Sequence, residues 1–128
     1  MIVGLGMDGV EVARIRRILG GPPEIARRFL ARCFTDAERK YCDKFRDRAA
    51  RYAARFAAKE AASKALGTPS GIGWLEVEVV RAEGAPALVL RGAAADTAQR
   101  MGVARTHLTL THDGGIAAAT VVLEGGAG

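Results

Sequence analysis

The run RFAAKEAASKALG, residues 55–67, lies in the longest helix that the sequence predicts. Alanine fills much of this run, and alanine has the highest helix propensity of all residues. We expect the helix to extend from Asp47 to Leu66, because Gly67 then supplies a C-terminal stop. A helix of this length is about 30 Å long, which is close to the diameter of a small domain.

Three shorter helices are expected before the long one. Apolar residues at helical spacing predict the first over residues 11–19, and Gly20-Gly21-Pro22-Pro23 ends it. The second is expected over residues 23–32. The third begins at Thr35, because Thr35-Asp36-Ala37-Glu38 has the pattern of a capping box. In the second helix the residues expected to face inward are Ile25, Phe29 and Leu30.

The remaining segments have the pattern of strands. Residues 2–7 are apolar and predict a short buried strand that ends at Asp8. After Gly67 the apolar period changes from helical spacing to alternation. We expect strands over residues 74–80, 88–90, 106–111 and 116–123, with a short helix over residues 93–101. This order predicts an α+β fold in which a mostly antiparallel sheet packs against the long helix, in a single domain spanning residues 1–128.

Composition is that of an ordinary globular domain. The chain has 128 residues, of which 49% are hydrophobic and 26% are charged. No apolar run approaches the roughly 20 residues that cross a bilayer, and the opening residues lack a basic leader. We therefore expect a cytoplasmic protein without a membrane partner. Cys33 and Cys42 stand without a neighbouring Cys or His pattern, which favours reduced, half-buried thiols over a zinc site.

The net charge of +5 comes mainly from arginine and lysine residues in the first half of the chain. Such a field attracts anions, whether a nucleic acid, a phosphorylated cofactor or an acidic protein. Charged helix faces often serve only to keep a protein hydrated, and isolated surface charges contribute little to stability. Few aromatic residues accompany the basic ones, so a base-stacking surface has little support and we expect no nucleic-acid partner.

Two carboxylates occupy positions where burial would be costly. Asp8 closes the apolar opening strand, and Glu60 continues the stripe of Tyr52 and Phe56 along the long helix. A buried carboxylate needs a cation or several hydrogen-bond donors. The simpler interpretation is that Lys64, one turn after Glu60, forms an ion pair with it. The alternative is that both carboxylates bind Mg²⁺, which retains several waters and takes substrate phosphates as further ligands.

Basic and hydroxyl side chains surround Glu60 and favour the second interpretation. Glu60, Ser63 and Lys64 share one face of the predicted helix, and Arg55, Lys59 and Ser63 share the adjoining face. Lysine and arginine at these positions would neutralise phosphate oxygens that the metal does not bind. We therefore expect a site for a phosphorylated donor along this helix.

In order along the chain, several motifs resemble one family. Gly6-Met7-Asp8-Gly9-Val10-Glu11 with Arg14-Ile15, followed by the run 55–67, is similar to the holo-[acyl-carrier-protein] synthases, the short bacterial type of phosphopantetheinyl transferase. Supporting motifs are Gly73-Trp74 before an acidic strand, Gly84-Ala85-Pro86 before residues 88–90, and residues 107–112. The resemblance covers nearly the whole chain, and the Phe-Ala-Ala-Lys-Glu-Ala stretch is its most specific part.

The resemblance implies an enzyme of fatty acid biosynthesis. The implied reaction is Mg²⁺-dependent transfer of 4′-phosphopantetheine from coenzyme A to a serine of apo-acyl carrier protein, which releases adenosine 3′,5′-bisphosphate. It also implies a homotrimer with sites between subunits. The implied metal ligands and catalytic residues are Asp8 and Glu60, with Lys64 beside the donor's diphosphate. Residues implied in holding coenzyme A are Ser63, Lys64, Gly67, Pro86 and His107, beside Arg55 and Lys59 from the helix-face argument. Residues implied in docking the carrier protein are Arg14, Arg27, Arg28 and Phe29.

Two other functions remain open from the residues alone. A non-catalytic module could bind a polyanion through the basic helices, without magnesium and with a steep salt dependence. A small magnesium-dependent hydrolase could act on nucleotides without any carrier protein. His107 and His112 are five positions apart in a predicted strand, so their side chains point to opposite faces and are not expected to share a metal.

Overall fold

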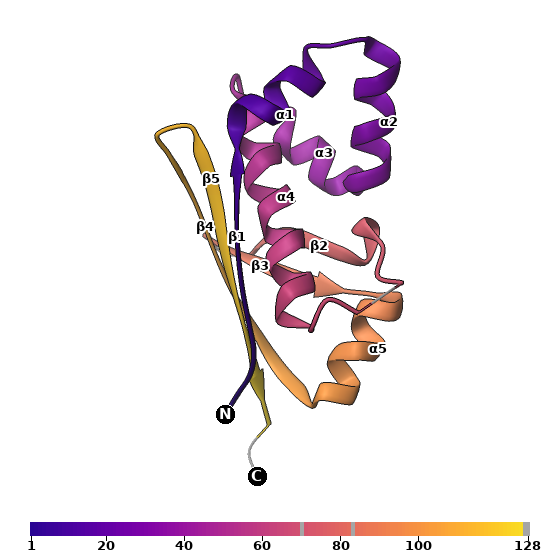
Figure 1. The fold of residues 1–128 in the computed structure, drawn as a ribbon, viewed down its shortest axis with the longest axis vertical. Helices are drawn as coiled ribbons and strands as arrows, with labels where there is room; N and C mark the ends of the chain where they lie inside the picture. Colours follow the sequence, from indigo (N-terminus) through magenta and orange to yellow (C-terminus); the bar gives the residue numbers. More distant parts are fainter. Residues whose placement is uncertain (70, 83, 127–128) are drawn as a thin grey trace.

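The computed structural model describes residues 1–69, 71–82 and 84–126 (Figure 1). Helices prevail in the first half of the chain and strands in the second. The elements in chain order are β1 (Ile2–Glu11), α1 (Val12–Leu19), α2 (Pro23–Cys33), α3 (Asp36–Cys42), α4 (Arg48–Ala65), the 3₁₀ turn η1 (Trp74–Glu76), β2 (Val77–Ala82), β3 (Ala85–Leu90), α5 (Gly92–Met101), β4 (Val103–Asp113) and β5 (Ile116–Gly125).

The described strands form two antiparallel sheets, a three-stranded one in the order β1-β5-β4 and a two-stranded one made of β2 and β3. Helix α4 packs across β1 and β5, and the β2–β3 hairpin runs past α4 and reaches β4 (Figure 1). All the labelled helices lie on one side of the three-stranded sheet. The predicted α+β fold, with a mostly antiparallel sheet packed against a long helix, is therefore confirmed, although the strands are divided between two sheets.

Small residues let α4 lie very close to β1. A Cβ atom placed on Gly6 would lie 2.0 Å from the carbonyl oxygen of Ala61, and one placed on Gly4 would lie 2.3 Å from that of Ala65. Both distances are far inside van der Waals contact, so only glycine fits at these two positions. The facing side of α4 is largely buried alanine, which completes the close approach. These two glycines fix the position of the helix relative to the strand.

The predicted opening strand is wrong in its end and in its burial. Strand β1 continues to Glu11, so Asp8 lies within the strand, opposite Ala119 of β5. Because alternate residues of a strand point to opposite faces, only one face of β1 meets α4. The other face leaves Leu5 and Met7 65% and 67% exposed.

Three further details differ from the sequence prediction, and one agrees with it. Ile25 is exposed on α2 and does not face inward, and the strand expected from residue 74 begins at Val77, after η1. Cys33 and Cys42 are free thiols, as expected, but they are fully buried. The capping box at the start of α3 is confirmed, since Thr35 and Glu38 exchange both of its hydrogen bonds. Within the described residues no helix is both long and apolar enough to cross a membrane.

Candidate active site

The site begins where β1 and α4 touch. The Lys64 ammonium donates hydrogen bonds to Oδ1 of Asp8 at 2.9 Å and to the carbonyl oxygen of Met7 at 3.1 Å. The hydrogen bond and charge of Asp8 raise the pKa of Lys64, and the charge of Glu60 raises it further. Glu60 lies one turn before Lys64 on α4. The two carboxylates therefore act on the same ammonium from two different elements.

The ion pair differs from the simpler interpretation of the sequence. That interpretation paired Lys64 with Glu60, whereas the structure pairs it directly with Asp8. The reason is the close approach of α4 at Gly6, since the residue two positions further along β1 then points toward the same helix. Half of the Lys64 side chain is exposed, so the ammonium can exchange this partner for a phosphate.

A cavity of about 180 Å³ lies next to Glu60 and Ser63. Its lining joins charged and hydroxyl groups from α4 to apolar residues that follow α4 in the chain. The residues that line it are Lys59, Glu60, Ser63, Ile72, Gly73, Trp74 and Val77. The Trp74 ring stacks on Phe56 with 4.7 Å between the ring centroids, which supports the apolar wall. The cavity can hold a ligand that combines an anionic group with an apolar arm. The sequence had indicated Trp74 only as a supporting motif and had given no signal for Ile72 or Val77.

The donor set at this site fits magnesium that is shared with a substrate phosphate. In the part of the chain that the structure describes, no three His, Cys, Asp or Glu side chains group into a metal site. Magnesium is commonly held by one or two carboxylates, with waters and substrate phosphates completing its shell. Asp8 and Glu60 meet that requirement, provided that Lys64 releases Asp8 when the phosphate arrives.

Two basic residues expected to bind the donor lie inside the protein. Lys59 is 2% exposed, and its ammonium lies 2.8 Å from Oε1 of Glu38. Arg55 is also buried, with its guanidinium 4.4 Å from the Tyr41 ring centroid and 3.5 Å from the carbonyl oxygen of Arg51. Lys59 lines the cavity beside Ser63, as the helix-face argument expected, whereas Arg55 does not line it. The sequence assigned Glu38 only to the helix cap and gave no signal for its ion pair with Lys59.

His107 lies away from Asp8 within one chain. Its side chain projects from the face of the three-stranded sheet opposite α4, where it forms a 2.8 Å hydrogen bond with Glu124. The hydrogen bond from His107 lowers the pKa of Glu124. Gly67 follows Leu66, the C-terminal cap of α4, and Pro86 lies in the β2–β3 hairpin. The chain therefore pairs Asp8 with Lys64 beside Glu60 and Ser63 of the same helix, while His107 points out from the face of the sheet opposite α4.

The residues expected to dock a partner lie on α1 and α2. Arg27 and Arg28 are exposed and pair with Glu24 one turn earlier on α2. Arg14 and Phe29 both approach Phe56, with the Arg14 guanidinium 5.9 Å from the ring centroid and the Phe29 ring at the same centroid distance. Because Phe56 also stacks on Trp74, packed side chains connect the basic helices to the cavity wall.

Comparison with known proteins identifies the class of enzyme. Residues 4–121 match the profile of the 4′-phosphopantetheinyl transferase superfamily, so the chain belongs to that superfamily. A curated holo-[acyl-carrier-protein] synthase of Anaeromyxobacter dehalogenans is 70% identical over 125 residues, which cover 98% of both chains. The chain therefore groups with the holo-[acyl-carrier-protein] synthases, and it is a phosphopantetheinyl transferase.

Solved structures agree with this assignment. The holo-[acyl-carrier-protein] synthase of Neisseria meningitidis superposes with a TM-score of 0.84 at 28% identity, covering 97% of this chain and 99% of that one. The synthase of Helicobacter pylori, solved in complex with coenzyme A, superposes with a TM-score of 0.79 at 28% identity. That alignment covers 94% of this chain and 99% of that one.

Proposed function

We propose that the protein transfers 4′-phosphopantetheine from coenzyme A to a serine of apo-acyl carrier protein, with Mg²⁺ held by Asp8 and Glu60. The products are holo-acyl carrier protein and adenosine 3′,5′-bisphosphate, and the setting is cytoplasmic fatty acid biosynthesis. One observation carries the proposal: Asp8 of β1 pairs at 2.9 Å with Lys64 of α4, one turn after Glu60, and Glu60 lines a cavity of mixed polarity. The coenzyme A complex of the Helicobacter pylori relative supports the choice of donor.

Each residue of the site has a separate task in this reaction. The serine oxygen attacks the phosphorus that carries pantetheine, and the bond to the nucleotide's phosphate oxygen breaks. A metal ion bound here would withdraw charge from the diphosphate. Asp8 and Glu60 would hold that ion, while Lys64, released from Asp8, would neutralise or protonate the leaving phosphate. The Ser63 hydroxyl would donate a hydrogen bond to the donor from the cavity side. A basic surface for an acidic carrier protein would be formed by Arg14, Arg27 and Arg28, together with Phe29.

The direct test follows the mass of the carrier protein. Incubation with apo-carrier protein, coenzyme A and Mg²⁺ should add the mass of one phosphopantetheine group and release adenosine 3′,5′-bisphosphate in equal amount. Chelation of the metal should stop both. Nucleotide hydrolysis without any change in the carrier would favour the hydrolase alternative. Salt-sensitive nucleic-acid binding without transfer would favour the polyanion-binding alternative.

We further propose that three copies assemble through the uncovered face of the three-stranded sheet, with active sites between subunits. Two observations support a second copy as the occupant of this face. Exposed Leu5 and Met7 lie on it, and exposed apolar groups of this kind are typical of interaction surfaces. His107, implied in donor binding, projects from the same face and away from Asp8 of its own chain. A neighbouring subunit can bring the two residues together.

Assembly and shared sites can be tested separately. Replacing Leu5 and Met7 together by serine should give monomers in light scattering after gel filtration, whereas Ile25→Ser, which removes an exposed apolar residue of α2, should leave the trimer intact. For the shared site, Glu60→Gln and His107→Ala should each reduce transfer. When the two variants are mixed and allowed to exchange subunits, part of the transfer activity should return. Some interfaces then contain the native residue at both positions. A mixture no more active than its components would contradict sites between subunits.

A further inference from the structure

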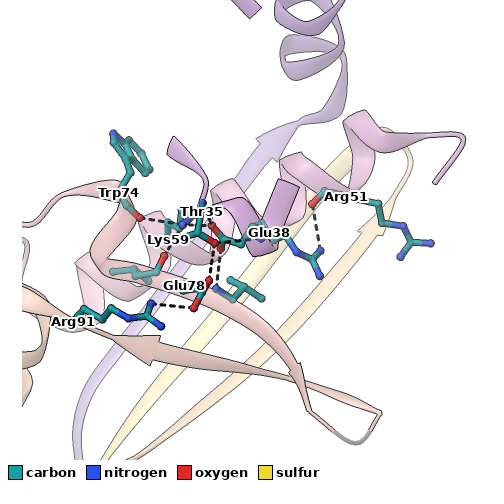
Figure 2. A network of polar contacts seen from close by, with 10 residues as sticks. Thr35, Glu38, Arg51, Lys59, Trp74, Glu78 and Arg91 are labelled. Carbon is teal, nitrogen blue, oxygen red and sulfur yellow. Dashed lines mark hydrogen bonds and ion pairs between the residues drawn. The ribbon is translucent and has the colours of Figure 1, made fainter. Parts of the chain in front are cut away.

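The Lys59 ammonium is buried, and three oxygen atoms surround it (Figure 2). Its Nζ lies 2.8 Å from Oε1 of Glu38, 3.0 Å from the carbonyl oxygen of Trp74 and 2.5 Å from that of Val77. A lysine ammonium has three N–H donors and no acceptor. All three donors are therefore used within the protein, and a donor phosphate could contact this ammonium only if one of these bonds were broken.

The two carbonyl groups belong to the wall of the cavity. Trp74 and Val77 stand at either end of the turn η1, and both line the cavity opposite Glu60 and Ser63 of α4. Glu76 closes the same turn by accepting hydrogen bonds from the backbone N–H groups of Gly73 and Ala93, each at 2.7 Å. Glu76 thus fixes the internal shape of the turn, and Lys59 fixes its position relative to α4.

Glu38 anchors the other side of the ammonium. Its Oε1 accepts the N–H of Thr35 and its Oε2 accepts the N–H of Val79, both at 2.8 Å. Both side chains of the pair are buried, with exposed fractions of 1% for Lys59 and 0% for Glu38. Burial is the main influence on Lys59 and lowers its pKa, while the charge of Glu38 acts in the opposite direction. The carboxylate is held by backbone groups of α3 and β2, so the ammonium has a fixed reference point.

We infer that Lys59 is a positioning residue for the transfer reaction: it holds the Gly73–Trp74 wall at the distance from Glu60 and Ser63 that the pantetheine arm of the donor needs. The inference rests on the proposed function and deepens it. Lys59 acts through the two carbonyl groups and not by contact with the donor's phosphates. A residue with this task influences how well the donor binds, and has less influence on the step that breaks the phosphate bond.

The chain contains a single tryptophan, and it is Trp74. Its fluorescence therefore reports the position of the wall without any substrate. The informative variant is Lys59→Met combined with Glu38→Gln, because it removes both buried charges while leaving the Trp74 and Val77 carbonyl groups without their donor. Lys44→Met, which removes an exposed lysine, is the matched control. Where the single variant Lys59→Met folds, its Trp74 fluorescence is measured as well.

In the folded double variant we expect a red-shifted Trp74 emission and stronger quenching by acrylamide, with the Lys44→Met control unchanged. We also expect the KM for coenzyme A to rise about tenfold while kcat falls less than threefold, because uniform binding is lost. Far-UV circular dichroism checks the fold of each variant before either measurement.

Other results would overturn the inference. Native Trp74 fluorescence together with a native KM in the double variant would mean that Lys59 only neutralises Glu38. A raised KM with unchanged fluorescence would make Lys59 a direct ligand of the donor. A double variant that does not fold would assign Lys59 to the fold as a whole. If the wild-type protein transferred no phosphopantetheine, the proposed function would fail, and the fluorescence comparison would still decide whether Lys59 positions the wall.

Discussion

Lys59 and Glu60 are neighbours in the sequence, yet they belong to two ionic clusters in opposite surroundings. Lys59 pairs with Glu38 inside the protein, whereas Glu60 lies one turn before Lys64, which pairs with Asp8 near the surface. The N–O distances of the two ion pairs, 2.8 Å and 2.9 Å, are almost the same. The two pairs differ in their exposure to solvent, since the Lys59 side chain is fully buried and half of the Lys64 side chain is exposed. Pair geometry alone therefore says little about what an ion pair does.

The two lysines respond to these surroundings in opposite directions. Burial is the largest influence on Lys59 and lowers its pKa, whereas the hydrogen bond to Asp8 is the largest influence on Lys64 and raises its pKa. A buried pair is held by its hydrogen bonds and is costly to break. An exposed pair contributes little to stability and exchanges partners readily. The buried cluster is thus suited to hold structure and the exposed cluster to meet a substrate.

The strongest test of this division is Glu60→Gln in the exposed cluster. Removing the charge while keeping the shape should leave the fold intact and lower the rate of transfer at least about a thousandfold, equivalent to roughly 4 kcal/mol, because a metal ligand at the reacting phosphate is lost. Mass spectrometry of the carrier protein under single-turnover conditions measures the rate.

The matched control for this variant is Glu24→Gln. Glu24 is also exposed and also beside basic residues, in its case Arg27 and Arg28 of α2. Its substitution should change transfer by far less than that of Glu60. A Glu60→Gln protein with a native circular dichroism spectrum and near-native turnover would reject Glu60 as a metal ligand.

Lys59→Met in the buried cluster should act on stability instead. Its loss leaves the Glu38 carboxylate buried without a counter-charge, which typically costs about 3–5 kcal/mol. Urea unfolding followed by circular dichroism measures the change in free energy of unfolding. Combining Lys59→Met with Glu38→Gln should restore part of it, because no unpaired charge then remains. Equal stability of the single variant and the wild type would mean that burial does not separate the two clusters.

The outer end of the buried cluster offers a sharper version of the same test. Arg91 pairs with Glu78 at 2.9 Å, but its side chain is 54% exposed. Glu78 also accepts a 2.6 Å hydrogen bond from the Thr35 hydroxyl, so it keeps a partner when Arg91 is lost. Arg91→Met should therefore cost less than about 1 kcal/mol, the usual range for exposed pairs, in the same urea experiment. A loss as large as that of Lys59→Met would show that the network acts as one unit.

Local patterns in the sequence predicted the helices and one of the clusters in outline. The capping box at Thr35 and the stop at Gly67 act within one turn of the chain, so they placed the start of α3 and the end of α4 correctly. The stripe along α4 also pointed to Glu60 and Lys64 as candidates. These features depend on neighbours three or four residues away.

Contacts between distant elements could not be predicted in the same way. The Glu38–Lys59 pair depends on how α3 sits against α4, and Glu38 was accounted for by its helix cap alone. The partner of Lys64 depends on the close approach that Gly6 permits. The burial of β1 was misjudged because an apolar run does not tell whether both faces of a strand are covered. In each case the deciding term is packing between elements, which residue spacing does not encode.

The smallest expected effect concerns the titration of Lys64, and it separates the contributions of the two carboxylates. The pKa of Lys64 should lie above the ordinary lysine value of about 10.4, and Asp8→Asn should lower it more than Glu60→Gln does, since Asp8 supplies the hydrogen bond and the larger charge effect. NMR titration of the lysine side-chain amines measures both shifts. Because the pKa is raised in the folded state, the stabilisation from this pair is complete below the unfolded value and is lost as the pH rises through the folded one. Wild type and Asp8→Asn should therefore differ in stability near neutral pH and converge in strong alkali, and a gap that widened with pH would contradict the pairing of Lys64 with Asp8.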